Sequence, residues 1–286
     1  MGLNRPITIG RIDYTNVWPI FHYAEDLLPA DRFVIDRRVP SALNAAMQRG
    51  EIDITSMSSY AYAQYADHFL LLPDLSVSAK GRVNSILLIT KEPMEKVLGG
   101  TIAMTSTSAT SINLLKILMS MYYQASPAFI TMEPSLDQML GSADAALLIG
   151  DTAITASWRS EGFTVIDLGE LWRNWTGCGM TFALFAVRKE VAAADPQAVS
   201  QVLQALTASK SRSLKDTGPL VHKAMAQLGG TEAYWRQYFQ GLTYNFGTEE
   251  QRGLSLYFEY ARSLGLLDQD VRMEFFVDHT ALQVNE

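Results

Sequence analysis

In the first half of the chain, short apolar runs with the length of strands alternate with stretches of helical periodicity. Leu43, Ala46 and Met47 fall on one face of a helix, for example, and Gly50 follows as its end. We expect, in chain order, a strand at 7–9, a helix from Pro19 towards Leu28, a strand at 33–35, a helix at 41–49 and a strand that begins at 51–54. The pattern therefore predicts a strand–helix–strand–helix–strand unit.

A second unit of the same design follows. It is expected to contain a strand at 101–104, a long helix with Ile112, Leu115, Leu118, Met119 and Tyr122 on one face, a strand at 128–131, a helix at 136–140 and a strand at 145–149. A Gly-x-x-Asp pattern precedes the third strand of each unit, as Gly50/Asp53 and as Gly141/Asp144, 91 residues apart. The first half thus uses one construction twice.

Alternating strands and helices predict parallel sheets with helices on their faces, an α/β fold. Ligands of such sheets bind beyond the carboxyl ends of the strands. The polar residues that follow the predicted strands are Asn16, Ser58, Ser59, the stretch 106–111, and Gly150 with Asp151. We expect them on one functional edge of two lobes, with a cleft between the lobes.

Two further apolar runs flank the second unit and are expected to cross between the lobes. They are 84–90 and 181–187. We therefore expect lobe one to begin with 1–89, lobe two to comprise 90–186, and 187–286 to complete lobe one as a return strand and a helical tail. In that tail, Asp195-Pro196 is typical of a helix start, and Thr248-Glu249-Glu250-Gln251 is typical of a capping box.

Composition and charge restrict the class of partner. The 286 residues are 48% hydrophobic and 19% charged, which is ordinary for a globular chain of two domains or lobes. A net charge of −7 argues against nucleic acid, although backbone dipoles can still hold a small anion. Cys178 is the single cysteine, so no intrachain disulfide can form. We expect a cytoplasmic protein, because no export signal or membrane-spanning run is recognisable.

Common catalytic signatures are absent. The sequence has no phosphate-binding glycine loop, no zinc-protease motif and no nucleophile elbow. Its four histidines are scattered, and none lies in a predicted edge turn: His22, His68, His222 and His279. We therefore expect neither a metal site nor a histidine-based triad, and no cofactor.

Small hydroxyl and amide groups remain as candidate chemistry. Thr107, Ser108, Thr110 and Ser111 open a helix, where hydroxyls and free N–H groups together can bind a carboxylate, although plain capping needs only one of them. Ser58 and Ser59 offer the same from lobe one. Asn16 is either a functional amide or a turn residue, and Asp151 is either a base or an anchor. Thr176 and Gly177 are expected in a tight turn whose backbone lies near the cleft.

Several stretches resemble the chorismate dehydratases of the futalosine route to menaquinone. They are IGRIDYTNVWP at 9–19, LLPDLSVSA at 71–79, VNSILL at 83–88, TSATS at 107–111, LLIGD at 147–151 and WTG at 175–177. The resemblance covers roughly residues 7–190, and the helical tail adds little. Thr15, where many members carry leucine, and Cys178, in place of a proline, depart from the family pattern.

This resemblance implies a type II periplasmic-binding-protein fold, two α/β lobes joined by two crossing strands. It also implies a carbon–oxygen lyase that converts chorismate into 3-[(1-carboxyvinyl)oxy]benzoate and water. Asn16 and Ser85 would be catalytic, with no metal or cofactor. The substrate-binding set would be Ser58, Ser59, Thr107, Ser108, Thr110, Ser111, Gly150, Asp151, Thr176 and Gly177. The proton acceptor and the choice between monomer and homodimer stay open.

Three other functions compete with this one. A carboxylate-binding transport protein would share the fold, but it would normally carry an export signal. The effector part of a transcription regulator would need a basic DNA-binding segment, which is not recognisable before residue 7. Among enzymes, 1,4-dihydroxy-6-naphthoate synthase of the same pathway is the nearest rival, and the Asp-Tyr-x-Asn-Val-x-Pro turn favours the dehydratase.

Overall fold

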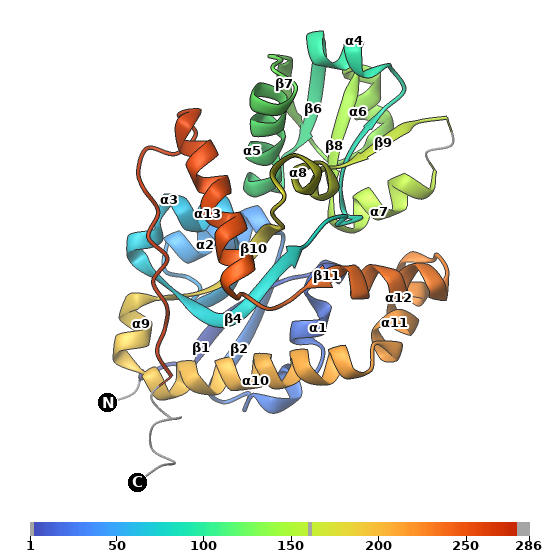
Figure 1. Cartoon of the computed structure of the whole chain (residues 1–286). Coiled ribbons are helices and arrows are strands. Elements are labelled where there is room, and N and C mark those ends of the chain that lie inside the picture. Colours follow the sequence, from blue (N-terminus) through green and yellow to red (C-terminus); the bar gives the residue numbers. More distant parts are fainter. Residues whose placement is uncertain (1–2, 160–161, 279–286) are drawn as a thin grey trace.

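The chain folds into two α/β lobes, one above the other in Figure 1. The computed structural model describes residues 3–159 and 162–278. A six-stranded sheet, ordered β11-β4-β10-β3-β1-β2, forms lobe one, and a five-stranded sheet, ordered β7-β6-β8-β5-β9, forms lobe two. The α/β class and the two-lobed architecture are therefore confirmed.

The predicted repeat is confirmed by strand order and direction. The first unit consists of β1 (Ile7–Ile12), α1 (Trp18–Phe21), β2 (Phe33–Arg38), α2 (Pro40–Gln48) and β3 (Ile54–Ser58). The second consists of β6 (Thr101–Thr105), α5 (Ala109–Ile117), β7 (Ala128–Met132), α6 (Leu136–Ser142) and β8 (Ala145–Ile149). In each unit the first strand lies in the middle and pairs in parallel with the other two.

The repeated aspartates explain why the pattern recurs. Oδ2 of Asp53 accepts a hydrogen bond from the backbone N–H of Thr8 at 2.9 Å, and Oδ2 of Asp144 accepts from that of Thr101 at 2.9 Å. In both units the aspartate lies just before the third strand, so its carboxylate holds the beginning of the third strand beside that of the first.

Two helices differ from their expected lengths. The helix predicted from Pro19 towards Leu28 ends at Phe21, because the N–H of Tyr23 donates to Ser209 of the tail at 2.9 Å instead of continuing the helix. A short 3-10 turn follows at Glu25–Leu27. The long helix of the second unit is α-helical only to Ile117 and closes with a π-helical turn at Leu118–Tyr122.

The two expected crossing strands each belong wholly to one sheet. β5 (Ile86–Thr90) pairs antiparallel with β8 and with β9 (Thr164–Asp167) in lobe two. β10 (Met180–Arg188) pairs antiparallel with β3 and with β4 (Phe69–Ala79) in lobe one. The chain changes sheet in residues 80–85 and 177–179, so the divisions expected at 89/90 and 186/187 fall within paired strands.

The remaining elements are mostly helical. They are α3 (Ser59–Gln64), α4 (Met94–Gly99), α7 (Gly150–Trp158), α8 (Leu168–Thr176), α9 (Lys189–Ala194), α10 (Pro196–Lys215), α11 (Gly218–Leu228), α12 (Glu232–Gly241), β11 (Leu242–Thr243), α13 (Thr248–Ser263) and two 3-10 turns, Thr15–Val17 and Ala66–His68. No described helix is both long and apolar enough to cross a membrane. Most buried apolar side chains form one cluster that runs through both lobes.

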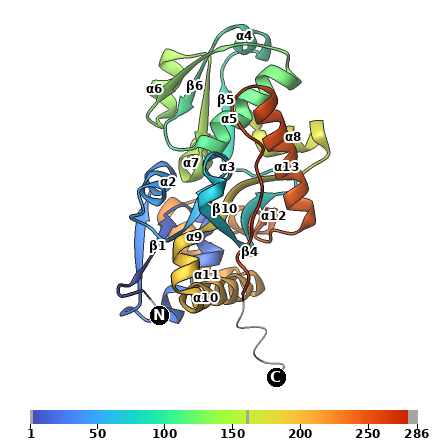
Figure 2. The same cartoon turned by 90° about the vertical axis from the view of Figure 1, so that its left-hand side faces the viewer.

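The caps predicted in the tail are largely correct. Asp195 caps α10 by accepting from the N–H of Ala198 at 3.0 Å. At α13 the Glu250 carboxylate accepts from the N–H of Gly247 at 2.9 Å, so the cap lies one residue earlier than expected. The tail does not cover lobe one alone, because α13 packs against α3 and also against α5 of lobe two (Figure 2).

Candidate functional site

The turn after β1 is fastened to the opposite lobe. Thr15 is fully buried, and its N–H and Oγ1 both donate to Oδ1 of Asp151, at 3.1 and 2.6 Å. Asp151 is the second residue of α7, which follows β8 directly. The prediction that these two strand ends face one another is therefore confirmed. In this structure Asp151 has the geometry of an anchor.

The neighbour of Thr15 carries the most conspicuous polar atom in the turn. Oδ1 of Asn16 is buried and has no hydrogen-bond partner among the described residues. A buried amide oxygen without a partner is unfavourable, since it has lost its bonds to water. Such an atom is available to a ligand that offers a donor.

Ser85 lies at the same junction, directly before β5. Its carbonyl accepts from the N–H of Gly150 at 2.7 Å, and its hydroxyl makes a long bond of 3.3 Å to the carbonyl of Val83. The buried carboxylate of Asp167 holds the preceding segment by accepting from the N–H groups of Val83, at 3.0 and 3.1 Å, and Asn84, at 2.6 Å. The position of Ser85 is therefore fixed from both sides.

Gly150 allows a close approach between the lobes. Its φ of +60° lies in the left-handed region, and a Cβ there would lie 2.9 Å from the ring of Tyr14. The side chain of Thr107 lies against the Tyr14 hydroxyl and lowers its pKa, although burial is the stronger influence and raises the pKa overall. The structure thus brings Asn16, Ser85, Thr107, Gly150 and Asp151 together.

The hydroxyl-rich start of α5 is next to this group. Ser108 is the cap, since its Oγ accepts from the N–H of Ser111 at 3.2 Å and donates to the Ser111 hydroxyl at 3.0 Å. Thr110 is fully buried, and its Oγ1 accepts from the N–H of Tyr60 in α3 at 3.0 Å. The hydroxyl of Thr110 therefore serves the contact between the lobes.

The serines of lobe one have protein partners too. Oγ of Ser58 caps α3 through the N–H of Ala61 at 3.3 Å and accepts from Asn44 at 3.2 Å. Ser59 is fully buried, and its hydroxyl donates to the carbonyl of Thr181 in β10 at 2.8 Å. Ser58 retains the position of a helix start near α5, whereas the hydroxyl of Ser59 is directed to the hinge.

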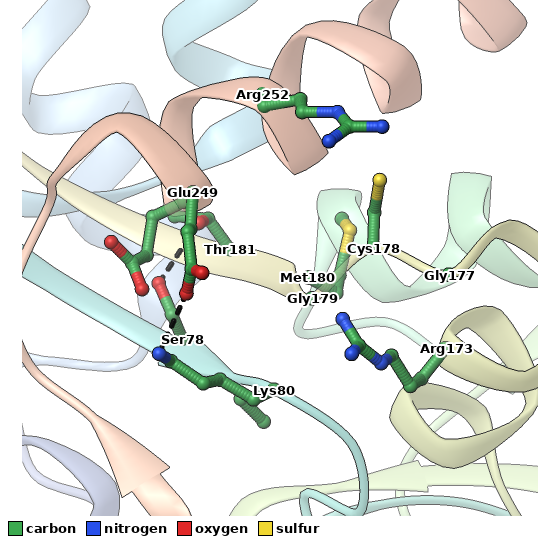
Figure 3. Close-up of a pocket in the computed structure, with 12 residues that line it drawn as sticks. Ser78, Lys80, Arg173, Gly177, Cys178, Gly179, Met180, Thr181, Glu249 and Arg252 are labelled. Carbon is green, nitrogen blue, oxygen red and sulfur yellow. Dashed lines mark hydrogen bonds and ion pairs between the residues drawn. The ribbon is translucent and has the colours of Figure 1, made fainter.

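Thr176 and Gly177 lie at the hinge, the segments 80–85 and 177–179 in which the chain passes between the two sheets. They are apart from the group around Asn16. Thr176 is the last residue of α8, where its Oγ1 bonds the carbonyl of Trp172, so the expected tight turn is the end of a helix. Gly177 ends that helix with a φ of +71°. Of the twelve predicted site residues, Gly177 alone lines the cavity of about 260 Å³ at the hinge, into which Arg173 and Cys178 point (Figure 3).

The electrostatics of the junction centre on Asp151. Burial, the largest influence, raises the pKa of Asp151, and the nearby charge of Asp13 raises it further, while the two bonds from Thr15 act in the opposite direction. Among the described residues, no group of three or more His, Cys, Asp or Glu side chains could hold a metal ion. His279 lies outside the described residues.

Sequence reasoning missed two tyrosines of this site. Tyr14 lies two residues before Asn16, yet nothing in the sequence shows that its ring lies against Gly150. Tyr238 of α12 is 1% exposed, and its hydroxyl lies near those of Ser85 and Thr15. A buried tyrosine in an amphipathic tail helix has the same sequence signature as ordinary core packing, so no available signal marked it.

Comparisons with solved structures identify the fold. Protein AF1704 of Archaeoglobus fulgidus has a TM-score of 0.75 at 18% identity, covering 92% of this chain and 99% of that one. The alkanesulfonate-binding protein SsuA of Xanthomonas axonopodis pv. citri, bound to MOPS, has a TM-score of 0.71 at 14% identity, covering 95% and 97%. The expected periplasmic-binding-protein fold is therefore confirmed.

Comparisons with curated sequences identify the family. A chorismate dehydratase of Thermus thermophilus is 31% identical over 277 residues, 92% of this chain and 96% of that protein. A 1,4-dihydroxy-6-naphtoate synthase of the same organism is 25% identical over 78% of this chain and 81% of that protein. The family described as menaquinone biosynthesis matches residues 7–263. On that match, the chain belongs to the menaquinone biosynthesis family.

Proposed function

We propose that this protein is a chorismate dehydratase, a carbon–oxygen lyase that converts chorismate into 3-[(1-carboxyvinyl)oxy]benzoate and water. One geometric observation carries the proposal. The Asn16 amide oxygen, which is buried and has no hydrogen-bond partner in the described part of the chain, lies in the turn that Thr15 and Asp151 fasten beside Ser85. The 31% identity to a chorismate dehydratase, over almost the full length of both chains, supports the same reaction.

The reaction requires no covalent bond between the protein and the substrate. The C–O bond of the ring hydroxyl breaks, the neighbouring ring carbon loses its proton, and the electron pair of that C–H bond completes an aromatic ring. Proton and hydroxide leave together as water. Aromatisation supplies the driving force, so the protein has to orient the substrate and stabilise charge as it develops.

The residues divide between these tasks. Asn16 and Ser85 contact the reacting end. Oδ1 of Asn16 accepts a hydrogen bond from the ring hydroxyl of the substrate and so orients it, and the Ser85 hydroxyl donates to the same oxygen as it departs, without either residue changing charge. Thr107 and Ser111 offer hydroxyls to one carboxylate at the start of α5, where the helix dipole favours an anion, and Ser108 holds this turn in place as its cap. The hydroxyls of Thr110 and Ser59 are engaged in protein contacts and have no role in this scheme.

The contacts of Asp151 bear on which group removes the proton from the substrate. Its Oδ1 already accepts two hydrogen bonds from Thr15, so its place in the scheme is to hold the turn that carries Asn16. We therefore assign proton removal to a carboxylate of the substrate itself. Closure of the lobes would exclude water and align that carboxylate with the ring proton.

The direct test is to incubate purified protein with chorismate and to follow the aromatic product by chromatography and ultraviolet absorbance. Asn16→Ala and Ser85→Ala should each lower kcat by about 10²-fold or more, in the range found for removal of one hydrogen-bonding group at a reacting centre. Ser255→Ala is a matched control, because that hydroxyl bonds its own helix on the exposed face of α13. Normal turnover in Asn16→Ala would remove Asn16 from the mechanism.

Two other outcomes have defined meanings. Turnover of a naphthoate-pathway substrate but not of chorismate would support the synthase, which the second curated relative favours. Binding of chorismate without conversion would support a carboxylate-binding protein, which the shared fold allows. Either result would refute the dehydratase assignment.

A further inference from the structure

A buried phenol hydroxyl at the proposed active site has no hydrogen-bond partner among the residues that the structure describes. Tyr238 of α12 is 1% exposed, and its hydroxyl makes no hydrogen bond with any described residue. Its ring is fixed by neighbours, since it lies parallel to Tyr234 at 6.3 Å and edge-on to Trp235 at 5.5 Å. Such a hydroxyl can be neither a solvated surface group nor a freely rotating one.

The surroundings of that hydroxyl are those of the reacting groups. Tyr238 and Asn84, the residue directly before Ser85, line one small cavity of about 240 Å³. Burial is the largest influence on the pKa of Tyr238 and raises it, while the nearby hydroxyls of Ser85 and, less strongly, Thr15 lower it. The charge of Asp151 also acts on it. Because the pKa is raised, the phenol stays protonated at neutral pH. Its hydroxyl can therefore donate a hydrogen bond to an acceptor that comes within reach.

The hydroxyl oxygen of Ser85 is the acceptor best placed for a hydrogen bond from Tyr238. The Ser85 hydroxyl is 3.3 Å from its one acceptor, the carbonyl of Val83, and both lone pairs of its oxygen are unused by the described residues. Oγ1 of Thr15, in contrast, is engaged at 2.6 Å with Asp151. A donor bonded to Oγ of Ser85 would fix the rotation of that hydroxyl and strengthen it as a donor in turn, since linked hydrogen bonds polarise one another.

We propose that Tyr238 is a positioning residue, which donates to Oγ of Ser85 when substrate is bound and so directs the Ser85 proton towards the departing hydroxyl. This inference rests on the proposed function. It assigns a role to the helical tail, which the family motifs did not reach. No covalent step is added, because the phenol donates a hydrogen bond and keeps its proton.

The test is Tyr238→Phe, which removes the hydroxyl and keeps the ring. We expect kcat to fall about tenfold, which is equivalent to about 1.4 kcal/mol, with KM within about twofold of the wild type. The melting temperature should stay the same or rise, because a buried hydroxyl without a partner is removed. Tyr244→Phe is the matched control, because Tyr244 is 2% exposed and its hydroxyl also has no partner among the described residues. The Tyr244→Phe variant should convert chorismate at the wild-type rate.

A double variant separates positioning from general packing. If Tyr238 acts through Ser85, Tyr238→Phe should have no further effect on kcat in the Ser85→Ala background. An equal loss of kcat in both backgrounds, or an unchanged kcat in the single variant, would overturn the inference. Failure of the wild type to convert chorismate would instead refute the proposed function, so the two failures are distinguishable.

Discussion

Replacing Asp151 by asparagine and by alanine distinguishes an anchor from a base. Asparagine retains an Oδ1 that can accept from both the N–H and the Oγ1 of Thr15, whereas alanine removes both contacts. Because Thr15 is fully buried, alanine leaves two polar groups without partners. The cost is about 1–3 kcal/mol for each group, or about 2–6 kcal/mol together.

This cost falls on the contact between the lobes, so it should appear in activity as well as in stability. We expect Asp151→Ala to lower kcat/KM by about 30-fold or more, because the arrangement that holds the lobes together becomes less favourable by about 2 kcal/mol or more, and each factor of ten corresponds to about 1.4 kcal/mol. Asp151→Asn should stay within about threefold of the wild type, since its amide cannot be a base and need not be one. Steady-state assays with chorismate measure both. A loss of about 10³-fold or more in Asp151→Asn would identify Asp151 as the base and refute the anchor role.

The pH dependence of stability gives a second measure of the same carboxyl group. Burial raises the pKa of Asp151 above its ordinary 3.8. A carboxyl group whose pKa is higher in the folded state contributes stability below its ordinary pKa, and this contribution is lost as the pH rises through the folded value. Asp151→Asn lacks this titration. Its stability relative to the wild type should therefore increase as the pH rises above about 4, in urea unfolding followed by circular dichroism.

The remaining predictions concern the segments that position the site. Gly150→Ala should lose about 1–3 kcal/mol of unfolding free energy, because φ is +60° and the new Cβ would press on Tyr14; an unchanged urea midpoint would contradict the close approach. Asp167→Ala should lose about 3 kcal/mol or more, because its carboxylate holds the N–H groups before Ser85, and turnover should fall with it. Wild-type turnover in Asp167→Ala at low temperature, where the variant stays folded, would show that Ser85 needs no such support.

The repeated unit could be predicted because its signals are local. Strand length, helical periodicity and the recurring Gly-x-x-Asp pattern each depend on residues close in the chain, and the parallel pairing follows from their alternation. The rule that ligand sites lie at the carboxyl ends of parallel strands predicts Asn16 and Asp151 on one edge, although they are far apart in sequence, and the bond from Thr15 to Asp151 joins those two strand ends. The exact crossings were not predictable, because an apolar run such as Ile86–Thr90 fits either sheet equally well.

What the sequence could not indicate was how each polar side chain divides its bonds. Ser108 and Thr110 stand two residues apart in one hydroxyl-rich stretch, yet one caps a helix and the other bonds Tyr60 across the lobes. Tyr238 gives the opposite case: it has the pattern of core packing, yet its hydroxyl, beside Ser85, has no hydrogen-bond partner within 3–159 and 162–278. The hydrogen-bond partner of a side chain depends on which residues lie near it in the folded chain, and the periodicity of the sequence does not contain that information.

The interleaving of the two sheets also affects how the chain can fold during synthesis. The five-stranded sheet comes from one uninterrupted stretch, Ile86–Asp167, so it can assemble as soon as that stretch has left the ribosome. The six-stranded sheet begins earlier in the chain but has β10 as an interior strand, between β4 and β3. A nascent chain that ends before about residue 188 lacks a complete β10, so β4 and β3 cannot yet be joined in one sheet. Lobe one therefore begins to be synthesised first but completes its sheet last.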